Sequence, residues 1–393
     1  VTLSGVLFGT VIVCSGQSNC ELAVAATENA TQVVANAGAT TPHMRIFQVK
    51  TEPTYYNVTT PQTNLTAGIP WVTPSPDTIS AFSAVCYYTG MALSHAHPGL
   101  PVGLIASSWG GTAIDVWMSP DALESCQGHS TKSVVPPNAN ADPGLGYLRG
   151  ELASEPPTQP STLWNSMMHP LADTLRVSGW LWYQGEANAF APENYASCFP
   201  GMITQWRENW LGAAPDVPFV FVQLSAWPSL DVGVISGIRY AQTAATALSN
   251  VSYVVAADRA DPAGSYHPIH PPFKQPIGER AALVFDRLIF KNTSVPLLGP
   301  QPVSVTYDPW QATWGKYHHG VPGGVCDTAA TGFYCAGIRV KFDQPITLKS
   351  TYGLNYGQFH SGFQLFNNAT GNPATGGTSP GSRHLVSPLC YDC

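Results

Sequence analysis

The sequence predicts an α/β fold with a doubly wound parallel sheet, followed by a separate or appended β-rich unit. Up to Leu298, short apolar runs rich in β-branched and aromatic residues alternate with segments in which apolar residues recur at helical spacing. This alternation is typical of strand–helix–strand units with a parallel sheet. After Pro300, short alternating runs and Gly/Pro turns replace the helical pattern. We therefore expect one domain over residues 1–298 and a β-rich domain over 299–393.

The first strand is expected in the apolar run that starts at Val6 and continues through Val11–Val13, because β-branched residues fill a strand that is buried on both faces. It ends in a turn at 15–19, and apolar residues at 21–26 then indicate a helix. Further strands are predicted at 44–49, 100–106, 177–183, 217–224 and 252–257, and in the β-rich unit at 302–307 and 337–342. Helices are predicted at 82–95, 163–175, 195–211, 238–248 and 278–290. The rest of 27–80 and all of 127–161 are rich in turn-forming residues and are expected to be surface loops, the second near the rim of the site or acting as a lid.

Composition argues against two classes of partner. Charged residues make up 10% of the 393 residues, and the formal net charge is −7. Nucleic acids and anionic membrane surfaces attract basic proteins, so neither has an electrostatic basis for binding here. The apolar opening of the chain is too short to span a bilayer, and the sequence contains no other candidate span.

Cysteines and glycosylation sequons favour a secreted or luminal, lysosomal-type glycoprotein. The nine cysteines form no convincing zinc pattern; Cys390 and Cys393 are expected to pair, and the odd count leaves at least one thiol, which we assign to a buried Cys14. Six Asn-x-Ser/Thr sequons occur, at Asn29, Asn57, Asn64, Asn250, Asn292 and Asn368. The opening lacks the basic residues of a signal peptide, so we expect that a preceding segment is missing or was removed by processing.

Ser18 is the predicted nucleophile. It follows the first strand in a tight turn, Gly16-Gln-Ser-Asn19, that leads into a helix. A hydroxyl in this position lies at the carboxyl edge of the sheet, where backbone N–H groups face developing negative charge. The alternative is that Ser18 is an ordinary helix N-cap.

Two further Gly-rich turns, at 107–112 and 184–188, follow predicted strands, and a fourth loop at 261–272 contains two histidines. In an open α/β sheet the carboxyl ends of the strands converge on one crevice. A serine nucleophile needs a base, commonly imidazole, and Gly-rich turns let backbone donors approach an oxyanion closely. The sequence therefore predicts a hydrolytic site at this edge of the sheet.

Five blocks, in this order, resemble those of the sialate O-acetylesterase branch of the SGNH hydrolases over roughly residues 1–290. They are GQSN, GLIASSWGGTAIDVWMS, WNSMMHPL, WYQGEANA and IHPPFKQPIGERAAL. The resemblance implies a three-layer α/β/α sandwich with a parallel sheet and removal of acetyl esters from carbohydrate, above all from sialic acids, without a cofactor. The family also carries a β-rich region before the first block, which this chain does not contain, so a separate or cleaved N-terminal β-rich segment is an expected partner.

Carried over by position, the resemblance makes Ser18 the nucleophile and His270 the general base. The N–H groups of Ser18 and of Gly110 or Gly111, together with the Gln184 side-chain amide, would form the oxyanion hole.

The chain departs from the SGNH pattern at two positions. Many SGNH enzymes have an Asp two or three residues before the catalytic His, and this chain has none there. The orienting acid must therefore come from elsewhere, with Glu186 first and Asp258 or Asp261 next, unless a dyad operates. Cys20 stands where the family usually has Met, a change expected to alter local packing alone.

Several alternatives remain open at this point. His267 could replace His270 as the base, and His169 is expected to be a hydrogen-bonded supporting residue. His318–His319 lacks a third ligand nearby, so no metal is predicted. The substrate could be acetylated xylan or another polysaccharide, and the chain could instead be a catalytically silent structural or glycan-binding glycoprotein.

Overall fold

The computed structural model describes residues 5–126, 156–225, 227, 232–259, 261, 269–298, 302–308, 324–327 and 334–342. Its centre is a seven-stranded sheet with the order β3-β2-β4-β1-β5-β6-β7. The strands are β1 Thr10–Gly16, β2 Met44–Val49, β3 Ala67–Val72, β4 Val102–Ser108, β5 Gly179–Tyr183, β6 Phe219–Gln223 and β7 Val251–Val255. All neighbouring pairs in this sheet are parallel except β2 and β3. The predicted parallel sheet is confirmed, with one antiparallel strand added at its edge.

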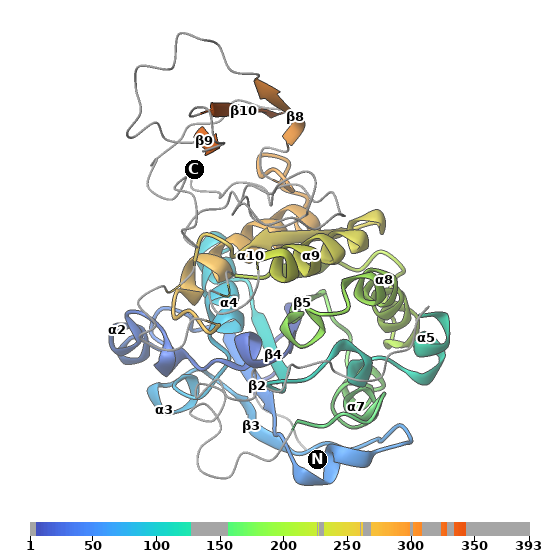
Figure 1. The fold of residues 1–393 in the computed structure, drawn as a ribbon. Helices are drawn as coiled ribbons and strands as arrows, with labels where there is room; N and C mark the ends of the chain where they lie inside the picture. Colours follow the sequence, from blue (N-terminus) through green and yellow to red (C-terminus); the bar gives the residue numbers. More distant parts are fainter. Residues whose placement is uncertain are drawn as a thin grey trace.

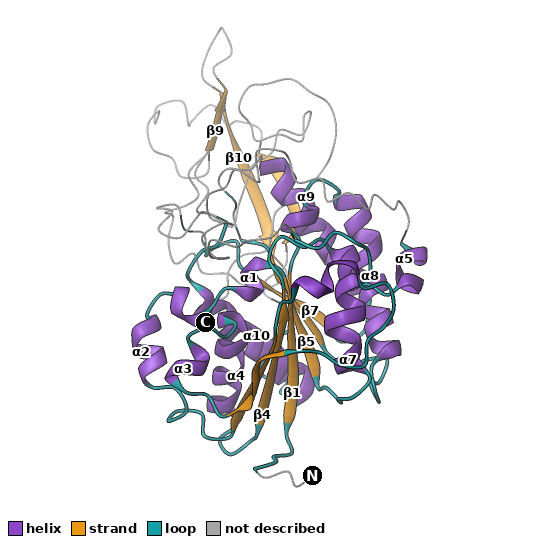
Figure 2. Ribbon diagram, turned by 90° about the horizontal axis from the view of Figure 1, so that it is seen from below, coloured by secondary structure: helices purple, strands orange, loops and turns teal. Residues whose placement is uncertain are grey.

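Helices cover both faces of this sheet. Figure 2 shows α4 and α10 on one side and α5, α7, α8 and α9 on the other. The helices are α1 Ser18–Glu21, α2 Ala30–Ala35, α3 Pro76–Ile79, α4 Ala84–Ala96, α5 Pro120–Ser125, α7 His169–Ala172, α8 Pro192–Asn209, α9 Val232–Gln242 and α10 Lys274–Ile289. The three-layer α/β/α sandwich implied by the resemblance is therefore confirmed.

The central strand β1 determines where the turns meet. It pairs with β4 on one side and with β5 on the other, and Gly16 at its end lies opposite both Ser108 and Tyr183. These three residues are the last of their strands. The turns that follow them therefore leave the sheet at the same level and next to one another. Figure 1 shows two of these strands, β4 and β5, in the middle of the α/β part.

Aromatic side chains join β5 to α8. Trp180 and Trp182 point to the same face because they are two residues apart in a strand. Their rings lie 6.3 Å and 5.6 Å from that of Trp206 in α8, between ring centroids, and all three are fully buried. This cluster fixes the helix layer on that face against the strand that leads to the second Gly-rich turn.

Several element predictions need correction, among them the helix at 21–26, where the structure has the short α1 over Ser18–Glu21 and a separate 3₁₀ turn over Val24–Ala26. The first strand begins at Thr10, the first residue that pairs with β4, and Phe8 is 92% exposed. The helix predicted at 163–175 is a π-helical turn over Trp164–Met168 followed by the short α7, since Pro170 lacks the N–H that would continue the earlier pattern. β3 was missed because Pro70 argues against a strand, although proline is tolerated at a sheet edge.

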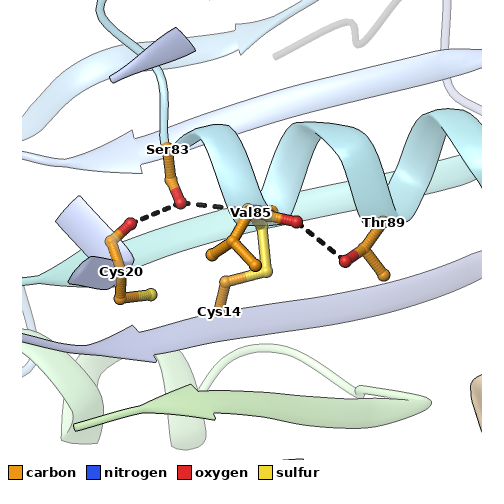
Figure 3. The surroundings of a disulfide bond; sticks show 6 residues. Cys14, Cys20, Ser83, Val85 and Thr89 are labelled. Atoms are coloured by element: carbon orange, nitrogen blue, oxygen red, sulfur yellow. Dashed lines mark hydrogen bonds between the residues drawn. A yellow bond between two sulfur atoms is a disulfide. The ribbon is translucent and has the colours of Figure 1, made fainter. Parts of the chain in front are cut away.

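The assignment of a free thiol to Cys14 was wrong. Cys14 of β1 forms a disulfide with Cys86 of α4 (Figure 3), and Cys126 forms one with Cys198. Cys20 is a free cysteine and is buried. Sequence reasoning failed here because α4 lies directly over β1, and no local signal places the two residues together.

Ser83 helps to seat the nucleophile turn on this helix. Its hydroxyl accepts from the Cys86 N–H as the N-cap of α4 and donates to the Cys20 carbonyl oxygen at 2.6 Å (Figure 3).

The C-terminal part contains a separate antiparallel sheet, with β8 Pro302–Asp308, β10 Tyr334–Phe342 and β9 Gly324–Asp327 in that order. The strands predicted at 302–307 and 337–342 are confirmed, and the domain boundary at 298 stays a prediction. Cys390, Cys393 and Asn368 lie outside the described residues.

Candidate active site

Gly16 allows the chain to turn sharply from β1 toward Ser18. Its φ is +141°, and a Cβ built on it would overlap the carbonyl oxygen of Tyr183 in the neighbouring strand. Glycine is therefore required for two reasons: other residues rarely adopt this φ, and there is no room for a Cβ atom. Two residues later, Ser18 opens the short α1, so its backbone N–H is among those that have no partner within the helix.

Ser18 and His270 lie in hydrogen-bond contact. Their Oγ and Nε2 atoms are 2.7 Å apart, although the residues are 252 positions apart in the chain. Both side chains are buried. A serine hydroxyl that donates to imidazole Nε2 is set up to lose its proton to that nitrogen as it attacks a carbonyl carbon.

Short backbone and side-chain contacts hold the Gly-rich turns together around Ser18. The Gln17 side-chain oxygen accepts from the N–H groups of Gly185 and Ala187, at 3.4 Å and 3.2 Å. The Trp109 N–H donates to the Gly16 carbonyl oxygen at 3.0 Å. The predicted convergence of these turns at one edge of the sheet is confirmed.

Gly110 lies against the nucleophile. A Cβ built on Gly110 would lie 3.2 Å from that of Ser18, so a larger residue would crowd the serine. The Gly110 N–H donates to the Glu21 carboxylate at 2.6 Å in this structure. Gly111, with φ +75°, makes the turn that follows. The Gly110 backbone therefore lies close to Ser18, and in this structure its N–H is bound by Glu21.

The Gln184 side chain is hydrogen-bonded within the protein in this structure. Its side-chain nitrogen donates to the Thr112 carbonyl oxygen at 3.1 Å and to Asn188 Oδ1 at 2.7 Å. A primary amide has two N–H bonds, so both are used within the protein. This buried side chain joins the turn after β4 to the turn after β5.

Asn19 connects Glu186 to the histidine segment. The Asn19 side-chain nitrogen donates to Glu186 Oε1 at 2.6 Å and to the Ile269 carbonyl oxygen, immediately before His270, at 2.9 Å. Burial raises the pKa of the Glu186 carboxyl, while its hydrogen bonds and the charge of Lys274 lower it again in part. Glu186 is thus coupled to the His270 segment through one intervening amide.

Asp258 has a different partner. Arg280 in α10 donates to both of its carboxylate oxygens, at 2.8 Å and 2.7 Å, a bidentate pair that ties the end of β7 to that helix. Asp261 is buried. The alternative base His267 lies outside the described residues, as does His318–His319.

Lys274 is a feature of the site that sequence reasoning missed. Its side chain is completely buried, and its Nζ donates to Asn19 Oδ1 at 2.6 Å and lies 5.2 Å from the centroid of the Tyr183 ring. Burial lowers the pKa of Lys274 to about 7, against the opposing effects of Glu186 and Cys20. The only signal in the sequence was a lysine in an apolar context at a helix start, four residues after the predicted base.

The remaining predictions concern residues away from Ser18. His169 Nδ1 is 2.9 Å from the Gln62 carbonyl oxygen, a supporting contact of the kind expected. Within the described ranges, His, Cys, Asp and Glu side chains form no group of three suited to a metal ion. None of the helices described is long and apolar enough to cross a bilayer.

Comparison with known proteins agrees with this geometry. A family model described as "Carbohydrate esterase, sialic acid-specific acetylesterase" matches residues 9–285. Sialate O-acetylesterase of Mus musculus is 31% identical over 334 residues, covering 76% of this chain and 60% of that protein. The Homo sapiens protein of the same name is 31% identical over 322 residues, covering 76% and 57%. The chain therefore spans about 60% of the length of the curated relatives that it matches.

Among solved structures, a carbohydrate acetylesterase from Xanthomonas citri is similar with a TM-score of 0.63 and 26% identity, covering 85% of this chain and 71% of that one. The family match runs from the start of β1 into α10 and includes Ser18, Glu186 and His270. It covers well over half of the sequence. The chain belongs to the carbohydrate esterase family of sialic acid-specific acetylesterases.

Proposed function

We propose that this chain is a serine esterase that hydrolyses acetyl esters of carbohydrate, with Ser18 as nucleophile and His270 as general base. The observation that carries the proposal is the 2.7 Å contact between Ser18 Oγ and His270 Nε2 in a buried site. Family membership and the similarity to a carbohydrate acetylesterase support the same reaction.

In the proposed reaction, Ser18 Oγ attacks the acetyl carbonyl carbon while its proton passes to His270 Nε2. The N–H groups of Ser18 and of Gly110 or Gly111 would stabilise the negative oxygen of the tetrahedral intermediate. His270 then protonates the leaving sugar hydroxyl, and an acetyl-enzyme remains. Water activated by His270 attacks this ester, acetate leaves, and the proton returns to Ser18 Oγ.

Three residues that do not react support this machinery. Gln184 is proposed to hold the two Gly-rich turns in register through its bonds to Thr112 and Asn188. Glu186 is proposed as the acid that acts on the His270 segment, through Asn19. Asp258 is assigned to fold stability because its carboxylate pairs with Arg280.

O-acetylated sialic acid is the first candidate substrate, because the mouse and human relatives are named sialate O-acetylesterases. Acetylated xylan or another polysaccharide is the second, favoured by the structural similarity to a more broadly named carbohydrate acetylesterase. The test is acetate release from 9-O-acetylated sialic acid, acetylated xylan and p-nitrophenyl acetate, each with wild type and Ser18→Ala. We expect Ser18-dependent release, fastest from the sialic acid. No Ser18-dependent release from any of the three would overturn the esterase proposal and leave the silent, glycan-binding alternative.

We also propose a secreted or lysosomal, luminal location. Two disulfides in the described part of the chain form in oxidising compartments. Three of the sequon asparagines, Asn29, Asn57 and Asn64, are exposed and accessible to a glycan.

The structure separates the sequons into two groups. The Asn250 side-chain nitrogen donates twice to Asp216, to its carbonyl oxygen and its carboxylate, and that of Asn292 donates to Asp286 at 2.6 Å. A glycan on either nitrogen would cost these bonds, so we expect high occupancy at the three exposed asparagines and low occupancy at these two. Glycopeptide mass spectrometry of protein from a secretory host measures this, and equal occupancy at all five would contradict it.

A further inference from the structure

Lys274 is buried in an unusual way, because its hydrogen-bond partner is a neutral amide. A lysine with no exposed surface loses the hydration of its charge, a cost that proteins seldom accept without a specific contact. Here the contact is the 2.6 Å bond from Nζ to Asn19 Oδ1. Glu186, the nearby carboxyl, influences Lys274 by its charge, whereas Asn19 binds both of them.

The bond from Lys274 determines which way the Asn19 amide faces. An amide group has nearly the same shape when its oxygen and nitrogen exchange places, so only its hydrogen-bond partners select one orientation. Lys274 is purely a donor and therefore requires the oxygen. The Asn19 nitrogen must then face the opposite side, where it meets Glu186 Oε1 and the Ile269 carbonyl oxygen. In the exchanged orientation, donors would face donors and oxygens would face oxygens in a site without exposed surface.

Asn19 connects the turn that carries Ser18 to the segment that carries His270. It directly follows Ser18 in the chain, and its bond to Ile269 holds the backbone directly before His270. The Ser18–His270 hydrogen bond therefore has a second link beside it, made of one side-chain amide. Lys274 can maintain this link in either charge state, because both the ammonium and the neutral amine carry N–H donors.

We infer that Lys274 is a positioning residue of this site: it fixes the orientation in which Asn19 holds the His270 segment against Ser18. The inference rests on the proposed esterase function. Neither Lys274 nor Asn19 is assigned a contact with the reacting atoms, so their effect should appear in the chemical step more than in substrate binding.

The first test is Lys274→Met, which keeps an unbranched apolar side chain and removes the donors. We expect kcat for acetate release to fall about 100-fold with little change in KM, the scale expected when a catalytic group is displaced by about 1 Å. Lys291→Met is the matched control, since Lys291 is exposed just beyond the other end of α10, and it should leave kcat unchanged. A wild-type kcat in Lys274→Met would overturn the inference.

A double-mutant cycle separates positioning from loss of stability. If Lys274 acts through Asn19, Lys274→Met should lower kcat no further in the Asn19→Ala background. Equal fold-losses in both backgrounds would overturn the inference. Should Lys274→Met fail to fold, Asn19→Ala alone replaces it: the methyl side chain can neither accept from Lys274 nor donate to Ile269. This variant should fold and lose kcat to a similar extent, and wild-type kcat in it would equally reject the idea.

The Ser18→Ala assay distinguishes this failure from failure of the proposed function. If acetate release depends on Ser18 and these variants keep full kcat, only the positioning role fails. If no Ser18-dependent release occurs, crystal structures of wild type and Lys274→Met still decide the inference. It predicts a displaced His270 segment in the variant, and an unchanged 2.7 Å contact between His270 Nε2 and Ser18 Oγ would overturn it.

Discussion

Ser18→Ala should lower kcat/KM for acetyl ester hydrolysis by at least about 1,000-fold, because serine hydrolases lose the covalent route when their nucleophile is removed. The residual rate would come from the backbone N–H groups near Ser18, which can still polarise the ester. The loss should be largest in kcat, since the substitution removes a single oxygen atom and leaves the side chains around Ser18 in place. Acetate release with purified protein measures the effect.

Ser80→Ala is the matched control for this prediction. The Ser80 hydroxyl donates to the Pro76 carbonyl oxygen at the surface, away from the nucleophile turn. This variant should keep wild-type kcat and KM. A Ser18→Ala rate within about threefold of wild type would show that another group performs the chemistry, and the acyl-enzyme mechanism would be abandoned.

Gly16→Ala should be among the most damaging single substitutions for stability. Its methyl group would overlap the Tyr183 carbonyl oxygen of β5, at a φ of +141° that residues with a side chain rarely adopt. Backbone strain and overpacking together predict a loss of about 3–5 kcal/mol in the free energy of unfolding. Urea-induced unfolding followed by tryptophan fluorescence measures it.

Gly99→Ala isolates the conformational part of this cost. Gly99 also has a positive φ, +88°, but a Cβ built on it meets nothing within 4 Å. It should therefore cost only about 1–2 kcal/mol, the strain of a left-handed backbone. If both alanine variants lose the same free energy of unfolding, the close approach of Gly16 to β5 does not constrain the turn.

Much of this fold was predictable because local patterns of residue types indicate its strands and turns. The apolar runs of β1, β4 and β5 and the glycines behind them were recognisable, and parallel pairing alone then brings Ser18 close to the turns at 107–112 and 184–188. The loop that carries His270 was expected at the same edge, and the choice of His270 within it came from the family resemblance.

Other features depend on contacts between residues far apart in the chain, which local sequence patterns do not indicate. The bond between Lys274 and Asn19 links positions 255 apart, and the residues that flank either position in the sequence do not indicate it. The pairing of Cys14 with Cys86 arises only when α4 is laid over β1. The two hydrogen bonds of the Gln184 side chain could not be predicted either, because a motif specifies a residue type, whereas hydrogen-bond partners are known only once the turns are folded.

The separation of Ser18 from His270 in the chain has a consequence for biosynthesis. The ribosome completes the strand and turn that carry the serine early, and the imidazole follows 252 residues later. A nascent polypeptide released before residue 270 is synthesised has an unreactive Ser18 hydroxyl, even if part of its sheet has already formed. In the proposed enzyme, ester cleavage therefore begins only after translation has passed residue 270 and that segment has docked against Ser18.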